Sequence, residues 1–449
     1  MIDLQARPSS LIENWSNLRG VLGASAPAYL DPVRESAFKR FEAKGIPSTK
    51  DEEFRYLLLR DLADVRYQPA YGSTVSRAEV GKTPLGEFEA ITVAFINGQY
   101  APELSTIHVL PDGAFAGTLE EASEQGLPVE EYLGKIATLE GKLGSSNDDR
   151  FVDLNTAYLS EGAFVYVPKG VSLEQPVHLL FISRADHGSF AAYPRTLILL
   201  EKGSDAKIVE SYIGLDGTYF TNAVTEVLLG RDAILEHTIC QQETPEAIHI
   251  KTVAVEQHAG STYTSNNVNF GGRIVRTDLN VFLTGEHTET WLNGANIATG
   301  EQAVDNHTRI DHMQPNCNSF EVYKSILRDK ALGVFNGKIF VYEDAQKTDA
   351  KQTNQGILLS PTATFNTKPQ LEIFADDVKC THGATVGQLR KDALFYLQAR
   401  GIPAQEAQAL LVYAFAAEVL EKISITPVRE ALEKILFAKL NETEALPKV

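Results

Sequence analysis

A glycine repeat in the middle of the chain restricts its fold more than any other feature. The segments EKGSDAKIVE, LLGRDAILEH, QHAGSTYTSN and LTGEHTETWL place Gly203, Gly230, Gly260 and Gly285 at similar positions, 27, 30 and 25 residues apart. A strand pattern resumes after each glycine, and helical periodicity is hard to find across residues 151–382. Strands that return at this interval, without helices between them, are typical of the coils of a solenoid.

The strands between these glycines alternate their two faces. In DLNVFL, Leu279, Val281 and Leu283 share one face, while Asn280 and Phe282 share the other. An antiparallel sandwich also repeats strands, but its turns usually lie about 8–12 residues apart and favour Asn-Gly or Asp-Gly. Because both of those signals are sparse here, we predict a parallel β-helix, also called a β-solenoid.

Two regions with different residue patterns flank this core. We therefore predict three domains: residues 1–150, 151–383 and 384–449. The first region mixes helix and strand patterns. In YLDPVRESAFKRFEAKG, Asp31 and Pro32 predict the start of a helix and Gly45 its end. The apolar residues expected on one face of this helix are Val33, Ala37, Phe38 and Phe41.

The last region reads as helical. One segment ends at Gly401, and Pro403 and Pro427 open two more. The middle segment has a broad apolar stripe at helical spacing: Leu410, Leu411, Ala414, Phe415, Val419 and Ile423. This region carries eight basic and eight acidic residues, so it is neutral. It could cap the last coil or bind a partner.

Net charge and cysteine content narrow the function classes. Lys+Arg 41 against Asp+Glu 59 gives a formal net charge of −18. That balance argues against a nucleic-acid or anionic-membrane partner, since both need a basic face. The start of the chain lacks the features of a secretory signal. No apolar run is long enough to span a membrane. Three cysteines do not make a disulfide framework, so we expect a cytoplasmic protein.

Nucleotide binding is not expected. The GKT at Gly81–Thr83 looks like the end of a phosphate loop, but that loop needs a glycine five positions earlier. Position 76 is Ser76, and no strand immediately precedes the motif.

Histidines and cysteines are the candidate metal ligands. Seven of the ten histidines lie between residues 237 and 382: His237, His249, His258, His287, His307, His312 and His382. Imidazole and thiolate suit transition metals and iron–sulfur clusters. Yet there is no CxxC or HExxH, and NHTRIDHMQPNC, which ends at Cys317, matches no metal template. We expect most of these histidines to be hydrogen-bonded strand residues and Cys240 to be a small core residue.

A carbohydrate-active β-helix enzyme is a second hypothesis. Glycoside cleavage needs two carboxyl groups across a groove, one of them protonated. Asp376 and Asp377 are adjacent, so on a strand they would point to opposite faces and could not form that pair. Trp291 is the only tryptophan of the solenoid region, so the aromatic platforms that a sugar groove uses are also sparse.

The stretch ADDVKCTHGATVGQL contains the most specific pair, Cys380 and His382. Two residues apart on a strand, their side chains would share a face at about 6–7 Å. That distance is too long for a direct Cys–His hydrogen bond, but it suits two side chains that reach one shared ligand. A buried cysteine beside a capping histidine at a strand end remains equally open.

The sequence around this pair closely resembles the SufB/SufD family of iron–sulfur cluster assembly proteins. The resemblance rests on FNGKIFVYEDAQKTDAKQTNQGILLSPTATFNTKPQLEIFADDVKCTHGATVGQL and the following ALFYLQARGI, with looser support from GIPSTKDEEFRY and GAFVYVPKGVSLEQPVHL. The details resemble the SufD branch, because Gly383 follows His382 where SufB usually has an acidic residue. The chain also lacks the extra cysteines of SufB, although the SufB paralogue stays an alternative.

The resemblance implies a scaffold without catalytic activity of its own. Proteins of this family have an N-terminal helical domain, a parallel β-helix core and C-terminal helices. A SufB-like subunit would pair through the β-helix, and a SufC-like ABC-type ATPase would bind the C-terminal helices and hydrolyse the ATP. In isolation the chain could pair with itself. The residues implied to contact the ATPase are Leu389, Leu394, Phe395, Tyr396, Arg400, Leu411 and Phe415.

The resemblance also changes the interpretation of Cys380 and His382. In this family the pair lies at the SufB–SufD interface, which implies that His382 binds iron or a nascent iron–sulfur cluster and that Cys380 is a nearby thiol. A cluster wants about four thiolate or imidazole ligands, and only two converge here. The cargo is therefore expected to be transient and shared with the partner subunit.

Overall fold

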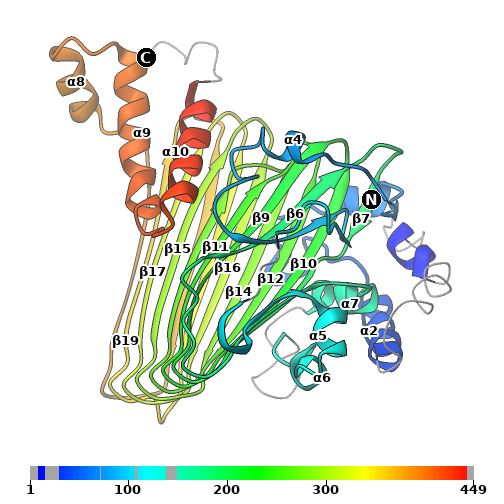
Figure 1. The fold of residues 1–449 in the computed structure, drawn as a ribbon. Coiled ribbons are helices and arrows are strands. Elements are labelled where there is room, and N and C mark those ends of the chain that lie inside the picture. The colour runs from blue at the N-terminus through cyan, green and yellow to red at the C-terminus, as the bar shows by residue number, and fades with distance from the viewer. Residues whose placement is uncertain (1–8, 16–29, 71, 107–109, 138–148, 442–449) are drawn as a thin grey trace.

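The computed structural model describes residues 9–15, 30–70, 72–106, 110–137 and 149–441 of the 449-residue chain. Two long sheets wind into a solenoid, with helices at its N-terminal end and along one side of its C-terminal end (Figure 1). From β8 onward the chain alternates between the sheets, and each strand pairs in parallel with its equivalent in the next coil. The predicted parallel β-helix is therefore confirmed.

We call the two sheets A and B. Sheet A runs in the order β4 (Phe115–Thr118), β5 (Ala163–Val167), β8 (Arg195–Leu200), β10 (Tyr219–Leu229), β12 (Ile248–Gln257), β14 (Ile274–Leu283), β16 (Ala303–His312), β18 (Leu332–Val341) and β20 (Thr364–Ile373), with β1 (Gln68–Pro69) and β7 (Phe190–Ala192) beside it. Sheet B runs in the order β3 (Gln99–Tyr100), β2 (Ile91–Ile96), β6 (Val177–Arg184), β9 (Asp205–Asp216), β11 (Ile234–Gln242), β13 (Thr262–Asn269), β15 (Glu289–Ala298), β17 (Asn318–Leu327), β19 (Asp349–Leu358) and β21 (Lys379–Gly387).

The turns from sheet A to sheet B explain why the glycine repeat is uneven. In each of these turns from β8 onward except the last, from β20 to β21, the residue two before the next strand has a positive φ: Gly203, Asp232, Gly260, His287, Asn316 and Lys347. Gly230 and Gly285 lie two residues earlier, where a Cβ would overlap the backbone of the preceding coil. The four glycines therefore occupy two positions of one turn, and only the left-handed position recurs at a nearly even interval.

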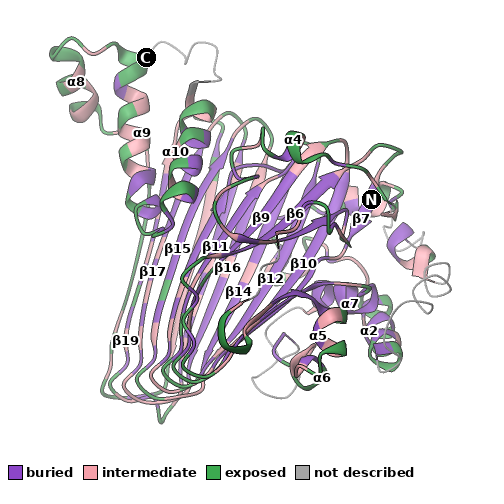
Figure 2. Cartoon of the chain, viewed as in Figure 1, coloured by how far each residue is buried: buried purple, intermediate pink, exposed green. Residues whose placement is uncertain are grey.

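Apolar side chains fill the interior of the solenoid. Leu279, Val281 and Leu283 belong to this core, as the alternation in DLNVFL predicted. Figure 2 shows that burial extends along most strands and declines toward β19, at the C-terminal end. In parallel sheets both faces tend to be covered, which is why the middle strands are buried almost throughout.

A group of charged side chains is also buried inside the early coils. The Nζ atom of Lys251 lies 2.5 Å from Glu210 Oε2, and His237 Nε2 lies 2.9 Å from Glu210 Oε1. All three side chains are fully buried. Burial raises the pKa of Glu210, but Lys251 and His237 together outweigh burial and lower that pKa. The pair satisfies two charges that the core could not hold separately.

The N-terminal region combines short helices with strands that continue the solenoid. Its helices are α2 (Leu30–Lys44), η2 (Glu52–Phe54), α3 (Arg60–Asp64), α4 (Arg77–Val80), η3 (Pro111–Gly113), α5 (Leu119–Glu124), α6 (Val129–Tyr132) and α7 (Arg150–Ala157). β2 extends sheet B by pairing in parallel with β6, whereas β2–β3 and β4–β5 are antiparallel. α7 packs against α2 on one side and β10 on the other.

Helix α2 differs from its prediction on one face. It ends before Gly45, whose φ of 66° is the left-handed conformation that glycine adopts readily at a helix C-terminus. Val33, expected on the buried face, is 44% exposed. Arg34 is buried instead, because its Nε donates a 2.7 Å hydrogen bond to the carbonyl of Leu159.

In the described part of the chain, three helices follow β21: α8 (Lys391–Ala399), α9 (Ala404–Leu420) and α10 (Thr426–Asn441). α9 contacts α8, α10 and the outer face of β15 and β17. The predicted stripe on α9 is partly wrong, since Leu410 is 45% exposed while Val412 and Ala416 are buried. These two pack with α10 and sheet B, so the buried face follows the neighbours rather than the widest apolar run. Among the described residues, no helix is long and apolar enough to cross a membrane.

Candidate functional site

The C-terminal end of the solenoid is open. β20 and β21 are the last strands of sheets A and B, so within the described chain each has a neighbouring strand on one edge only. Their side chains are mostly half-buried or exposed. The large apolar side chains exposed at this end are Ile373, Phe374 and Val386. Free backbone edges beside exposed apolar side chains are the features of a strand-pairing surface.

Cys380 and His382 lie on β21 and belong to the row of residues that faces the solenoid interior. In the register, Cys380 neighbours Ala350 and His382 neighbours Gln352, and both neighbours are buried. Because side chains alternate faces along a strand, the two candidates share one side. Within the part of the chain that the structure describes, no further coil covers them, so His382 is exposed and Cys380 is half-buried.

The Cys380 thiol is not activated by its surroundings. Burial raises its pKa, and the charge of Asp349 acts in the same direction. A metal would therefore have to displace the thiol proton on binding. Across the described ranges, no group of three or more His, Cys, Asp or Glu side chains is arranged to hold a metal ion. A metal ion at the open end would need ligands from beyond these residues.

The other candidate metal ligands from the sequence lie in the core, in a hydrogen bond or in a turn of the solenoid. Cys240 and Cys317 are free and buried, and burial raises the pKa of both thiols. His312 Nε2 is hydrogen-bonded to the hydroxyl of Ser319 at 2.9 Å. His287 is exposed in a left-handed turn position. NHTRIDHMQPNC therefore supplies packing and hydrogen bonds to the solenoid.

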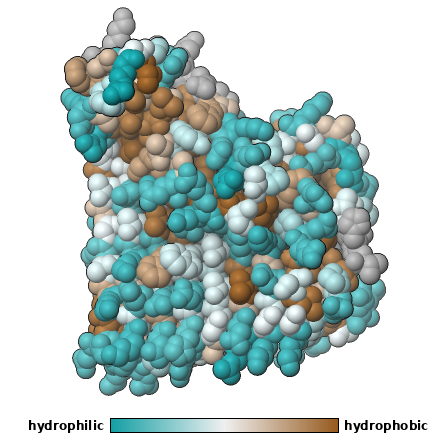
Figure 3. All heavy atoms as spheres, turned by 60° about the vertical axis from the view of Figure 1, so that its left-hand side comes forward, coloured by the Kyte–Doolittle hydropathy of each residue, from teal (hydrophilic) through white to brown (hydrophobic). Residues whose placement is uncertain are grey.

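Helix α8 presents two strongly exposed aromatic side chains. Phe395 is 71% exposed and Tyr396 is 57% exposed, with the Arg400 guanidinium 4.6 Å from the centroid of the Tyr396 ring. Leu389 and Leu394 are half-buried, and no residue of α8 is fully buried. Figure 3 shows hydrophobic side chains gathered over the C-terminal helices, above a largely hydrophilic solenoid face. Exposed apolar groups in one place are typical of a protein-binding surface.

The two candidates on α9 are less accessible than those on α8. Leu411 and Phe415 are half-buried. The Nζ atom of Lys324, on β17, lies 4.6 Å from the centroid of the Phe415 ring and forms an ion pair with Glu418. Phe415 therefore helps to attach α9 to sheet B.

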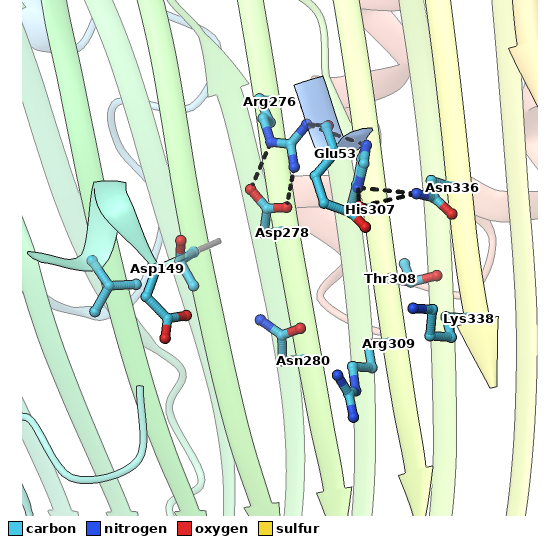
Figure 4. A pocket seen from close by; sticks show the side chains of 12 residues that line it. Glu53, Asp149, Arg276, Asp278, Asn280, His307, Thr308, Arg309, Asn336 and Lys338 are labelled. Carbon is cyan, nitrogen blue, oxygen red and sulfur yellow. Dashed lines mark hydrogen bonds and ion pairs between the residues drawn. The ribbon is translucent and has the colours of Figure 1, made fainter. Parts of the chain in front are cut away.

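A polar cluster on the outer face of sheet A was not anticipated from the sequence. Glu53 of η2 lies 3.2 Å from His307 Nδ1 (Figure 4). Asp305 lies 3.0 Å from His307 Nε2. Arg276 pairs with Asp305 at 2.7 Å and donates a hydrogen bond to the Glu53 carbonyl. Asn336 donates to the Glu53 carboxylate at 3.2 Å. The only sequence signal was the row of charged residues at outward-facing positions of β14, β16 and β18.

This cluster joins the N-terminal region to three coils and does not resemble a hydrolytic centre. Burial and Arg276 oppose a proton on His307, but Asp305 and Glu53 outweigh them and raise its pKa. Burial likewise opposes ionisation of Glu53, but His307 lowers the Glu53 pKa. Glycoside cleavage needs a carboxyl that keeps its proton. The cluster therefore fits an electrostatic attachment of the N-terminal region to sheet A, and it does not support the hypothesis of a carbohydrate-active enzyme.

Comparisons with known proteins agree with the resemblance seen in the sequence. Residues 6–179 match the family described as SufBD protein N-terminal region. Residues 181–415 match the family described as SUF system FeS cluster assembly, SufBD core domain.

Individual relatives align along most of the chain. An iron-sulfur cluster assembly SufBD family protein of Synechocystis sp. is 32% identical over 416 residues, 90% of each chain. The iron-sulfur cluster assembly protein SufD of Escherichia coli is 28% identical over 439 residues, 97% of each chain. SufD of Bacillus subtilis is 27% identical over 333 residues, 73% of this chain and 74% of the relative.

Proposed function

The chain belongs to the SufBD family of the SUF iron–sulfur cluster assembly system, and from this premise we propose that it is a non-catalytic scaffold subunit that helps to hold a nascent cluster. The observation that carries the proposal is the placement of Cys380 and His382 on the interior-facing row of β21, the last strand of the described chain, which no other described coil covers. A partner that closes this end would bring its own side chains next to them.

The partner at the open end is a SufB-like paralogue. The free edges of β20 and β21 can continue both sheets into a second solenoid, and the exposed side chains of Phe374 and Val386 would be covered by it. A paralogue is favoured over a second copy of this chain. A second copy could supply only another Cys380 and His382, whereas a paralogue can supply other ligand types. The partner would supply the remaining ligands that iron or a cluster needs.

A SufC-like ATPase binds the C-terminal helices. Phe395 and Tyr396 form an exposed aromatic pair on a helix that contacts the rest of the chain through α9. Aromatic residues are enriched at the centres of protein interfaces, where they contribute most of the binding energy. Nucleotide chemistry then belongs to the ATPase, in keeping with the missing phosphate-loop glycine at Ser76.

The test compares cluster content in the assembled complex. We would co-express the chain with SufB-like and SufC-like partners, purify the complex without oxygen, and measure iron, sulfide and the visible absorption of the cluster. His382→Ala should leave the subunit ratio unchanged and lower iron and sulfide content several-fold. His258→Ala is the matched control, because His258 is also an exposed solenoid histidine.

Two results would contradict the proposal. Unchanged iron and sulfide in His382→Ala would show that Cys380 and His382 are structural. A complex that forms equally well with Val386→Glu, which places a charge on the open end, would show that the partner binds elsewhere.

A further inference from the structure

His382 ends a column of interior residues whose last three members are all polar. In a parallel β-helix the register stacks equivalent residues on neighbouring strands, about 4.8 Å apart. The column that leads to His382 consists of Ile208, His237, Ser265, Leu292, Glu321, Gln352 and His382. Glu321 and Gln352 are each 1% exposed, so the column runs from a buried carboxyl group to the exposed imidazole.

A hydrogen bond fixes the orientation of the Gln352 side chain. Its Nε2 donates to Glu321 Oε2 at 2.7 Å, toward the preceding coil. An amide carries its oxygen and nitrogen on opposite sides of one planar carbon, so Oε1 is directed away from Glu321. Gln352 Oε1 is buried and has no hydrogen-bond partner among the described residues. A buried acceptor without a partner is costly and needs a reason.

Gly337 makes room for this arrangement. A Cβ at position 337 on β18 would overlap both the Nε2 and Cδ atoms of Gln352. Gly337 has no positive φ, so its backbone does not itself require glycine. The missing side chain is therefore explained by the Gln352 amide that lies against it.

We propose that Glu321 and Gln352 are positioning residues for His382. Rotation of the exposed His382 side chain would let Gln352 Oε1, oriented by Glu321, accept a hydrogen bond from one ring N–H, and this would leave the other ring nitrogen free to bind the iron or cluster cargo. The inference rests on the proposed function of His382. Metal-binding histidines usually donate their second N–H to a carbonyl or carboxylate, which fixes the tautomer and the orientation of the ring.

The first readout is the tautomer of His382, which needs no metal or partner. Nitrogen-15 NMR of the full-length, histidine-labelled chain, with His382→Ala for assignment, reports which ring nitrogen carries the proton. In the wild type one neutral tautomer should dominate. Gln352→Leu should shift the mixture to that of a free imidazole, and Gly337→Ala should shift it in the same direction by displacing the amide.

Two further variants control for folding and for position. Gln352→Leu leaves the Glu321 carboxyl without its donor, so the double variant Glu321→Leu/Gln352→Leu replaces both partners by apolar groups, a change that is often nearly neutral. Gln355→Leu is the matched control, because Gln355 lies on the same strand but faces outward and is half-buried. It should leave the His382 signal unchanged.

The second readout is iron in the assembled complex at limiting iron. Loss of the residue that orients a metal ligand usually weakens binding by about 10- to 100-fold, so Gln352→Leu should lower iron content while Gln355→Leu should not. If the His382 tautomer populations in Gln352→Leu and in the double variant equal those in the Gln355→Leu control, the inference is wrong. This holds even where His382→Ala abolishes iron binding. If the tautomer responds but His382→Ala retains its iron, the proposed function is wrong and the hydrogen bond stands.

Discussion

Replacing Glu321 by glutamine should make the protein more stable at alkaline pH but not at acidic pH. Glu321 is fully buried and has no cationic partner that lowers its pKa. Burial raises its pKa from 4.5 to about 7, and the Thr308 and Gln352 side chains only partly offset this effect. Glu321→Gln keeps the shape of the side chain and an oxygen that can accept the hydrogen bond from Gln352.

The size of the effect follows from the two pKa values. Below pH 4.5 the carboxyl is protonated in both the folded and the unfolded chain, so it carries no pH-dependent cost. As the pH rises toward 7, the unfolded chain releases the proton while the folded chain retains it, and stability falls. Each pKa unit corresponds to about 1.4 kcal/mol, so the wild type should lose roughly 3 kcal/mol by about pH 8.

Urea unfolding of wild type and Glu321→Gln at about pH 5.5 and about pH 8 measures this loss. The advantage of the variant should grow by about 2 kcal/mol between the two conditions. Glu301→Gln is the control, since Glu301 is an exposed carboxylate paired with Lys330 on the surface. A variant that is destabilised equally at both pH values would refute the reasoning, because Glu321 would then be a stabilising carboxylate.

Three further substitutions test the packing and the binding surface. Lys251→Met should lower the free energy of unfolding in urea by about 3–5 kcal/mol because Glu210 loses its buried cationic partner. Adding Glu210→Gln should restore most of that stability. A Lys251→Met variant as stable as wild type would show that the Lys251–Glu210 ion pair does not stabilise the core. Gly285→Ala should cost about 1–3 kcal/mol because its Cβ meets the backbone of Ala259, and an unchanged unfolding midpoint would show that the coils can separate. Phe395→Asp should abolish co-purification of the SufC-like ATPase while stability changes by no more than about 0.5 kcal/mol; retained binding would place the ATPase elsewhere.

The solenoid was predictable because its signal is local and repeated. Alternation within each strand and the return of a turn glycine are visible in single segments of the sequence. The left-handed turn position itself was not visible, because Asp232 and His287 occupy it where Gly203 and Gly260 do in other coils. Asparagine, aspartate and histidine tolerate this conformation, so residue type alone does not mark it.

Contacts between distant segments were beyond sequence reasoning. Nothing near residue 53 indicates that Glu53 pairs with His307, since the contact depends on how the N-terminal region lies across sheet A. On α9 the buried face is set by contacts with α10 and β17, so Val412 is buried there and the predicted Leu410 is exposed. Spacing singled out Cys380 and His382, and the family resemblance suggested their role, whereas the position of Gln352 beside His382 follows only from the register.

The two ends of the solenoid differ in a way that limits its assembly. At the N-terminal end the two sheets finish in the short antiparallel strands β3 and β4, whereas among the described residues the other end finishes in the long parallel strands β20 and β21, each with one neighbouring strand. A solenoid with two free ends could stack head to tail without closing and grow into a filament. If β3 and β4 do not accept a further coil, a chain of this kind can be extended only beyond β20 and β21. In the arrangement proposed above, the short antiparallel strands at the N-terminal end would then limit end-to-end association to two chains.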